Sequence, residues 1–206
     1  MKIISHRGYW QKPAEKNGEF AFRRSFDLGF GTETDVRDRL GELVISHDPP
    51  TGGEMRLADL LALHGRGPLP LAINIKADGL APALAREMAG VPCWFAFDCS
   101  VPDLRAHLEA GNPVLTRMSE IEPVPALLHR CAGVWLDAFE EDWLRPGLVA
   151  EMLLIGKWVF VVSPELHQRD PAPCWSILES FRTNGKLVLC TDQPERARAH
   201  FGVEQA

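Results

Sequence analysis

The sequence predicts a single (β/α)8 barrel that spans the whole chain, residues 1–206. Short apolar runs rich in Val, Ile, Leu and Trp alternate with helix-like stretches along its full length. Most of these runs are continuous, as in strands buried on both faces, and strands that alternate with helices indicate a parallel sheet. Roughly eight strand–helix repeats favour a closed barrel over an open sheet, and the chain is close to the lower limit of about 200 residues for that fold.

The apolar runs are the expected strands of this barrel. The second and third runs are treated as one barrel strand extended by a hairpin or loop, which keeps the number of repeats near that of the barrel fold. The expected strands are Ile3–His6, Thr32–Val36, Leu43–His47, Leu71–Lys76, Trp94–Asp98, Pro113–Met118, Gly133–Asp137, Lys157–Ser163 and Lys186–Thr191.

Helix-like stretches fill the intervals between these strands. In the first, Glu19–Gly29, the apolar residues Phe20, Phe22, Phe26 and Leu28 suit an amphipathic helix that is closed by a glycine. The expected helices are Glu19–Gly29, Leu57–His64, Leu80–Ala89, Val101–Ala110, Pro123–Arg130, Asp142–Ile155, Ala172–Thr183 and Pro194–Phe201.

Several polar and aromatic residues are expected to serve the fold rather than the function. Ser100 and Asp192 lie where helix N-caps belong, and Pro194 lies near a first helical turn. We expect the histidines in or beside helices at the surface and three tryptophans in core packing. These residues are His64, His107, His129 and His200, and Trp10, Trp135 and Trp143.

Composition narrows the function classes. Hydrophobic residues make up 46% and charged residues 24%, as in ordinary soluble globular proteins. The net charge of −6, with no basic run interleaved with aromatics, argues against a general nucleic-acid binder. No apolar run approaches the ~20 residues that span a bilayer, and the N-terminus is too short and polar for a signal peptide, so we expect a cytoplasmic protein. The glycine-rich phosphate loops of nucleotide-binding folds are missing.

The cysteines form an odd and scattered set without CxxC spacing. Such a set favours buried reduced thiols over a zinc site or a disulfide scaffold. They are Cys93, Cys99, Cys131, Cys174 and Cys190.

Polar residues gather at the strand ends of the first quarter of the chain. His6 and Arg7 end the first strand, Glu33 and Asp35 lie in the second, and His47 follows the third. Alternate residues of a strand face the same side, so Glu33 and Asp35 point together. The C-terminal strand ends carry the chemistry in this kind of barrel. Two histidines, an arginine and paired carboxylates suit metal-assisted chemistry on an anionic substrate.

Later strand ends add more polar residues to the same face. A ring of such groups in a dry barrel mouth is costly to desolvate without partners, a metal or a ligand. Taken singly, His6 also fits a hydrogen-bonded core histidine, Glu33 and Asp35 an edge strand, and Asp48 a turn before Pro49. The later residues are Asn74, Lys76, Asp98, Arg117, Asp137, Glu165, His167 and Asp192.

An ordered set of short motifs in the first 50 residues resembles the glycerophosphodiester phosphodiesterase family. That family is a (β/α)8-barrel group related to phosphatidylinositol-specific phospholipases C. Leu71–Lys76 resembles its third strand, and Cys190–Pro194 resembles its closing Thr-Asp-x-Pro turn, whereas residues 90–180 match only in strand–helix rhythm. The motifs of the ordered set are His6-Arg7-Gly8, Glu15 with Asn17, Phe22, Glu33-Thr34-Asp35-Val36 and His47-Asp48.

The resemblance implies a divalent cation, Mg²⁺ or Ca²⁺, held by Glu33, Asp35 and Asn74, since these ions prefer hard oxygen ligands. The family normally has a glutamate at the position of Asn74. An amide oxygen can still coordinate the cation, but the site loses one negative charge and should bind metal more weakly. Asp98 or Glu165 could substitute for the missing carboxylate.

The resemblance also implies roles for four residues around the phosphate. His6 and His47 act as general acid and base, because an imidazole titrates near neutral pH. Arg7 and Lys76 hold the non-bridging phosphate oxygens. Supporting positions fall on Glu15, Asn17 and Asp48.

Two loops of this chain also depart from the family's pattern. Only Pro49–Pro70 separates His47-Asp48 from the third-strand motif, so the subdomain that the family often inserts there is absent and the pocket should be more open. The first loop reads Pro13-Ala14-Glu15-Lys16-Asn17 where the family usually has Pro-Glu-Asn, so the support around His6 and Arg7 should be rearranged.

The resulting expectation is a metal-dependent phosphoric diester hydrolase. Its substrate is a glycerophosphodiester or a related small or lipid-derived phosphodiester, which places it in lipid metabolism. One alternative is a barrel that binds phosphodiesters or phosphate esters with weak or no turnover, because the third metal ligand is Asn74. Another is an intramolecular lyase that leaves a cyclic phosphate.

Overall fold

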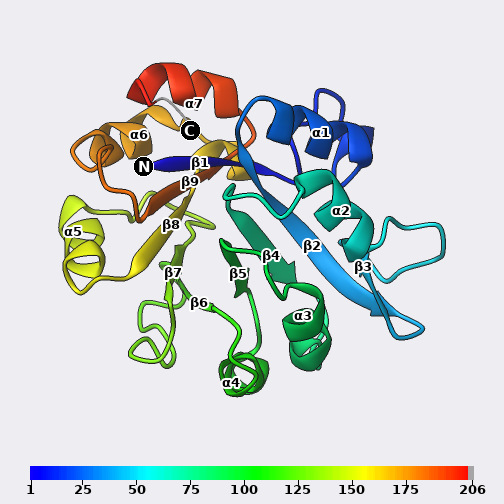
Figure 1. Ribbon diagram of the computed structural model, residues 1–206. Helices are drawn as coiled ribbons and strands as arrows, with labels where there is room; N and C mark the ends of the chain where they lie inside the picture. The colour runs from blue at the N-terminus through cyan, green and yellow to red at the C-terminus, as the bar shows by residue number, and fades with distance from the viewer. Residues whose placement is uncertain (204–206) are drawn as a thin grey trace.

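The computed structural model describes residues 1–203, which form one barrel surrounded by helices (Figure 1). Eight parallel strands follow the order β5-β4-β2-β1-β9-β8-β7-β6, and β3 pairs with β2 outside this path. This arrangement confirms the predicted (β/α)8 barrel. The strands are β1 (Lys2–His6), β2 (Gly31–Arg39), β3 (Glu42–Ile45), β4 (Leu71–Ile75), β5 (Trp94–Phe97), β6 (Leu115–Met118), β7 (Gly133–Leu136), β8 (Trp158–Val162) and β9 (Leu187–Thr191).

The barrel closes through a weak seam between β5 and β6. Ala96 and Val114 form an isolated parallel bridge there, and the Ala96 N–H donates to the Pro113 carbonyl at 2.9 Å. The other neighbouring strands of the ring are joined by continuous ladders. The barrel is therefore nearly closed, and its least connected side lies between the fourth and fifth strands of the ring in chain order.

Both faces of the barrel strands are buried, because successive residues point to opposite sides. Ile4 faces the barrel interior with Phe97, Trp135 and Phe160, whereas Ile3 packs in the layer beneath the helices. The rings of Trp135 and Phe97 stack with centroids 3.7 Å apart, which confirms the core position predicted for Trp135. Two buried faces explain why the strands read as continuous apolar runs.

The strand β2 continues past the barrel rim into the predicted hairpin. Val36 pairs with Ile45, and the turn lies at Leu40 and Gly41, whose φ angles are +52° and +86°. Two consecutive left-handed residues are typical of two-residue hairpin turns that match the twist of the strands. The hairpin forms the arm that carries the chain to His47.

Seven α-helices are present in the described part of the chain, and the eighth predicted helix is wrong. Residues 123–130 form bends and turns. Pro125 lacks an N–H and disfavours helical geometry at Val124, and Leu127 has a φ of +52°. The helices are α1 (Glu19–Asp27), α2 (Leu57–His64), α3 (Ala81–Glu87), α4 (Val101–Glu109), α5 (Pro146–Leu154), α6 (Ala172–Glu179) and α7 (Pro194–Phe201), with short 3₁₀ turns η1 (Pro13–Glu15) and η2 (Pro164–His167).

Two of the histidines expected at the surface are buried instead. His64 and His107 are 7% and 0% exposed, whereas His129 and His200 are exposed as expected. The Nε2 atom of His64 lies 2.9 Å from the Leu69 carbonyl, so the ring is accommodated in the interior by a backbone hydrogen bond. A buried polar ring with a partner costs little, and such a partner is not visible in the local sequence.

The cysteines are free thiols, as predicted. Cys131, Cys174 and Cys190 are buried, and Cys93 and Cys99 are half-buried. Among residues 1–203, none of the helices combines the length and the apolar character that crossing a lipid bilayer requires.

Candidate active site

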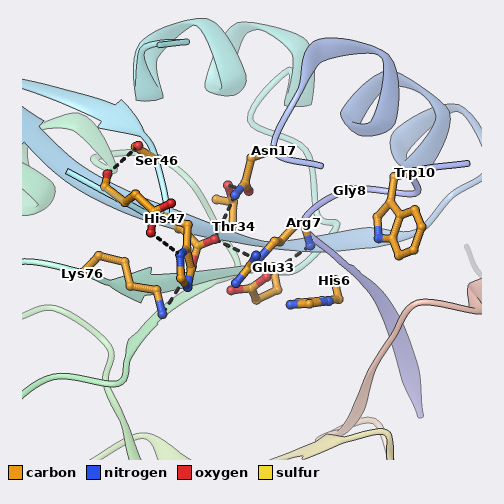
Figure 2. Close-up of polar contacts among 12 residues, drawn as sticks. His6, Arg7, Gly8, Trp10, Asn17, Glu33, Thr34, Ser46, His47 and Lys76 are labelled. Carbon is orange, nitrogen blue, oxygen red and sulfur yellow. Dashed lines mark hydrogen bonds and ion pairs between the residues drawn. The ribbon is translucent and has the colours of Figure 1, made fainter. Parts of the chain in front are cut away.

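Strand register at one edge of the barrel brings the predicted site residues together. His6, the last residue of β1, is the register partner of Glu33 in β2, and Asp35 in β2 is the partner of Asn74 in β4. Lys76 follows β4 directly. These side chains meet at the C-terminal ends of three adjacent strands (Figure 2), which is the face where this fold carries its chemistry.

Asp35 is the electrostatic centre of this group. Its carboxylate is completely buried, and its Oδ2 atom lies 2.9 Å from Nε of Arg7 and accepts a 2.8 Å hydrogen bond from Nδ2 of Asn17. Nζ of Lys76 lies 3.4 Å from Oδ1 on the other side. A buried carboxylate requires this compensation, because desolvation of an unpaired charge is strongly unfavourable. Arg7, Asn17 and Lys76 therefore all contact this one carboxylate.

A left-handed turn after β1 points Arg7 back across β2. Arg7 and Gly8 have φ angles of +58° and +78°. The Arg7 N–H donates to Oε2 of Glu33 at 3.1 Å, and the Gly8 N–H donates to Oγ1 of Thr32 at 2.9 Å. A Cβ atom on Gly8 would lie 2.7 Å from the Cβ of Ala21, so only glycine fits between the turn and α1.

The Glu33 carboxyl group is buried beside the Asp35 carboxylate, and both conditions affect its pKa. Burial raises the pKa of the Glu33 carboxyl to about 7, and the nearby Asp35 carboxylate adds to the effect. The charges of His6, Arg7 and Lys76 act in the opposite direction. Glu33 is therefore poised between its neutral and charged forms near neutral pH, and a bound cation would favour the carboxylate.

Two oxygen atoms of the group have no hydrogen-bond partner. Oδ1 of Asp35 and Oδ1 of Asn74 are buried and accept no hydrogen bond, although the Asp35 atom is ion-paired with Nζ of Lys76 at 3.4 Å, and the two residues are register partners on β2 and β4. With the Glu33 carboxylate they make three hard oxygen donors from adjacent strands, a set that suits Mg²⁺ or Ca²⁺. Asn74 thus lies beside Asp35, where the sequence predicted it.

The two carboxylates suggested as substitutes for the missing glutamate have partners of their own. Asp98 pairs with Nη1 of Arg117 at 3.0 Å. Glu165 accepts hydrogen bonds from the hydroxyls of Ser163 and Thr191 and from the Asp192 N–H.

His6 is oriented by a carboxylate that the sequence analysis assigned to a helix cap. Nδ1 of His6 lies 2.9 Å from Oδ1 of Asp192, and the Trp10 indole N–H donates to the same oxygen at 3.1 Å. The residue at the N-cap of α7 is Gln193, so the cap assignment for Asp192 is wrong. Its position at the end of the last barrel strand was the available signal, since that strand is the ring neighbour of β1.

His47 lies farther out than His6, at the rim. Its side chain is 48% exposed, and its Nδ1 atom lies 3.0 Å from Oδ1 of Asp48, which is itself 88% exposed. Nε of Arg37 donates to the His47 carbonyl at 3.0 Å and ties the residue to the hairpin arm. In Figure 2 His47 stands on the same side of the group as Lys76. The two histidines therefore have different surroundings, His6 half-buried in the site and His47 exposed at the rim.

The supporting residues divide between the site and its outer loop. Asn17 donates to Asp35 and accepts from the Thr34 hydroxyl at 2.9 Å, so it belongs to the site. Glu15 instead pairs with Arg24 at 3.0 Å and accepts from the Gln11 N–H, which stabilises the loop from behind.

A second polar pair lies on the opposite side of the mouth. Nε2 of His167, from η2 after β8, lies 2.8 Å from Oδ1 of Asp137 at the end of β7. The ring of Phe139 packs edge-on against His167. Both polar residues were identified as strand-end residues, but their pairing across two βα loops is visible only in the structure.

No family model matches this chain, and no curated protein matches it. Among solved structures, a glycerophosphodiester phosphodiesterase from Agrobacterium tumefaciens is similar, with a TM-score of 0.70 at 19% identity over 98% of this chain and 100% of that chain. The enzyme of the same name from Thermotoga maritima has a TM-score of 0.66 at 16% identity, over 96% and 97% of the two chains.

An Oleispira antarctica phosphodiesterase, solved in complex with the product sn-glycerol-3-phosphate, has a TM-score of 0.70 at 16% identity, over 98% and 97% of the two chains. At these identities the likeness establishes the fold, and this chain shares that fold with solved glycerophosphodiester phosphodiesterases over nearly its whole length.

Proposed function

We propose that this chain is a metal-dependent phosphoric diester hydrolase that acts on a glycerophosphodiester or a related small or lipid-derived phosphodiester. The observation that carries the proposal is the buried polar group around Asp35 in β2. Arg7 and Lys76 both pair with the Asp35 carboxylate, and Oδ1 of Asp35 and Oδ1 of Asn74 accept no hydrogen bond. The shared fold supports it, because the similar structures include phosphodiesterases, one of them with a glycerol phosphate product.

Glu33, Asp35 and Asn74 would hold the divalent cation, Mg²⁺ or Ca²⁺. When bound, such an ion supplies Lewis-acid stabilisation of the charge that develops on the phosphoryl oxygens. The orphaned oxygens of Asp35 and Asn74 support this assignment, since a cation would satisfy both at once.

Arg7 and Lys76 would bind the phosphodiester anion. Both lie within 3.4 Å of the Asp35 carboxylate, and their side chains are about one-fifth exposed, so each reaches the mouth from an anchored position. A guanidinium offers forked donors to two phosphate oxygens, and an ammonium acts as a compact charge. Positive charge held in place before the substrate arrives needs no rearrangement in the transition state.

His6 would transfer protons at the reacting oxygen through Nε2. Asp192 accepts from Nδ1, which fixes the ring and stabilises its protonated form. His47 would serve as the complementary acid or base from the rim, where its Nδ1 contact with Asp48 similarly leaves Nε2 available. One protonated and one neutral imidazole at neutral pH can supply both proton transfers that hydrolysis needs.

The second candidate is a barrel that binds phosphate esters without turning them over. Asn74 favours it, because replacing a glutamate by an amide removes one charge from the metal site. Tight anion binding without a metal requirement and without turnover would distinguish this candidate in calorimetry.

The test is hydrolysis of bis-(p-nitrophenyl) phosphate by purified protein with added Mg²⁺ or Ca²⁺. We expect turnover that a chelator abolishes and that His6→Ala and His47→Ala each lower by about 10²-fold or more. His129→Ala, a change of an exposed histidine, is the matched control and should leave the rate unchanged.

Undiminished rates in both histidine variants would overturn the assigned roles. Phosphorus NMR of the products from a glycerophosphodiester separates hydrolysis from a lyase reaction, because only the lyase leaves a cyclic phosphate.

A further inference from the structure

A compact cluster of ligand-type side chains lies on α4, separate from the candidate active site. Cys99 precedes α4, Asp103 lies in its first turn, and His107 lies one turn later. The spacing of four residues places Asp103 and His107 on one face of the helix, and Cys99 lies just before its N-cap Ser100. Sγ of Cys99, a carboxylate oxygen of Asp103 and an imidazole nitrogen of His107 all lie within 4.8 Å of one another.

Two atoms of this cluster are buried with no polar partner except each other. Oδ2 of Asp103 and Nε2 of His107 lie 3.3 Å apart as an ion pair, and their side chains are 4% and 0% exposed. Oxygen and nitrogen ligands on a tetrahedral zinc ion, each at about 2.0–2.1 Å, are separated by about 3.3 Å. The pair therefore already has the spacing of two ligands of one ion.

The surroundings of Cys99 are electronegative. The carboxylates of Asp103, Asp98 and Asp78 all act on its thiol. The same negative field attracts a divalent cation, and a coordinating thiol is deprotonated by the metal that it binds.

We propose that Cys99, Asp103 and His107 form a binding site for Zn²⁺ or a chemically similar divalent transition-metal ion. A thiolate, an imidazole and a carboxylate select such ions over Mg²⁺ and Ca²⁺, which prefer oxygen ligands alone. Three protein ligands leave the fourth tetrahedral position to water. The CxxC pattern does not detect this site, because its ligands are spaced by helical turns.

Outer contacts hold two of the ligands. The Gly79 N–H, from the loop after β4, donates to Oδ1 of Asp103 at 2.8 Å and leaves Oδ2 for the metal. Nδ2 of Asn112 lies 3.0 Å from both Nδ1 of His107 and the Ala81 carbonyl. In the metal-free protein this places the imidazole proton on Nε2. Metal binding at Nε2 moves that proton to Nδ1, turns the Asn112 amide oxygen toward it and releases the thiol proton of Cys99 to solvent.

The position of this cluster gives a metal ion a path from solvent and places the ion beside the weak seam between β5 and β6. Cys99 lines a cavity of about 230 Å³ together with Asp98, Thr116 and Arg117, so an ion can reach the thiol from solvent. The helix α4 connects β5 to β6, the two strands of the weak seam. A bound metal would join Cys99, just after β5, to His107 in the second turn of α4. Asp103 is also tied to the loop after β4, so the metal would stabilise the least connected side of the barrel.

The test is titration of the reduced protein with Co²⁺, in the presence of excess Mg²⁺ to occupy the oxygen site. We expect the sulfur-to-cobalt charge-transfer band of a thiolate complex, its displacement by Zn²⁺, and a rise of Tm with Zn²⁺. Cys99→Ser should remove the band, and His107→Gln should weaken cobalt binding by more than the 10- to 100-fold that loss of an outer contact typically costs. Cys93→Ser, at the other half-buried cysteine, is the matched control and should keep the band.

The absence of the band in the wild-type protein, or its persistence in Cys99→Ser, would overturn the proposal and leave Asp103 and His107 as a structural ion pair. If Cys99→Ser does not fold, alkylation of wild-type Cys99 decides the matter. Zn²⁺ should slow that reaction at Cys99 and leave Cys93 unaffected, and equal rates with and without Zn²⁺ would contradict the site. Each of these readouts is independent of phosphodiesterase activity.

Discussion

Asp35 and Asn74 are register partners on the adjacent parallel strands β2 and β4, and each has a buried side-chain Oδ1 atom without a hydrogen-bond partner. Buried polar atoms normally accept hydrogen bonds, and under the proposed function a bound cation would satisfy both oxygens. Asn74 is also the position where this chain departs from the glutamate of the family that it resembles. The pair is therefore the most informative place to test the metal site.

Asn74→Glu should tighten the binding of Mg²⁺ or Ca²⁺. A third carboxylate about 4 Å from a divalent ion adds an interaction on the order of 8 kcal/mol at an effective dielectric constant of 20, much of which is lost to desolvation. We expect at least about a tenfold fall in Kd by isothermal titration calorimetry. Asn184→Glu, before β9 at the opposite end of the barrel, is the control for added charge. Equal affinities in wild type and Asn74→Glu would place Asn74 outside the metal site.

Asp192→Asn should impair His6 without removing it. The amide keeps the shape of the carboxylate but can present a donor to Nδ1, and it cannot stabilise the protonated ring. We expect kcat to fall by about 10²-fold or more with an unchanged KM. Glu195→Gln, a nearby change on α7, should leave kcat within a few-fold of wild type. An unchanged kcat, or a loss that comes from KM alone, would contradict the orienting role of Asp192.

Gly8→Ala should destabilise the protein and displace Arg7. An added Cβ would lie 2.7 Å from the Cβ of Ala21, and the φ of +78° is unfavourable for alanine. The expected loss is about 1–3 kcal/mol in the free energy of unfolding, measured by urea denaturation. Gly147→Ala in α5 is the matched control, since its Cβ meets open space at a φ outside the left-handed region. Equal stabilities of the two variants would show that the turn after β1 is not constrained as described.

The buried His64 should make stability depend on pH in a defined window. Burial lowers its pKa below the ordinary 6.5, against a smaller raising effect of the Leu69 carbonyl. The unfolded state then binds a proton that the folded state does not, so this contribution is complete above pH 6.5 and is lost as the pH falls through 6.5 towards the lower folded pKa.

The slope from His64 cannot exceed about 1.4 kcal/mol per pH unit. Urea denaturation between pH 7 and pH 5 should show that His64→Gln loses part of the wild-type slope, whereas His129→Gln, at an exposed site, keeps it. A wild-type slope in His64→Gln would mean that this histidine is protonated equally in the folded and unfolded states.

Much of the barrel was predictable because its strands carry their own signal. Burial on both faces makes a run such as Trp158–Val162 continuously apolar. The helix predicted at residues 123–130 shows the limit, since its apolar spacing was outweighed by two prolines. Pairing between residues far apart in the chain could not be predicted in this way. Nothing local to Asp192 distinguishes a helix cap from a partner of His6, 186 residues away in the chain.

The sequence by itself determined the fold class, the alternation of strands and helices, and the positions of His6, Arg7, Glu33, Asp35, Asn74 and Lys76 at strand ends. These follow from local periodicity, because burial and side-chain direction repeat along each strand. Only the tertiary structure decided which of these groups are neighbours, that His47 stands exposed at the rim, and that His107 is buried beside Asp103. The physical reason is that strand register and helix packing set distances between residues far apart in the chain, and the pKa, the charge and the metal preference of each group depend on those distances.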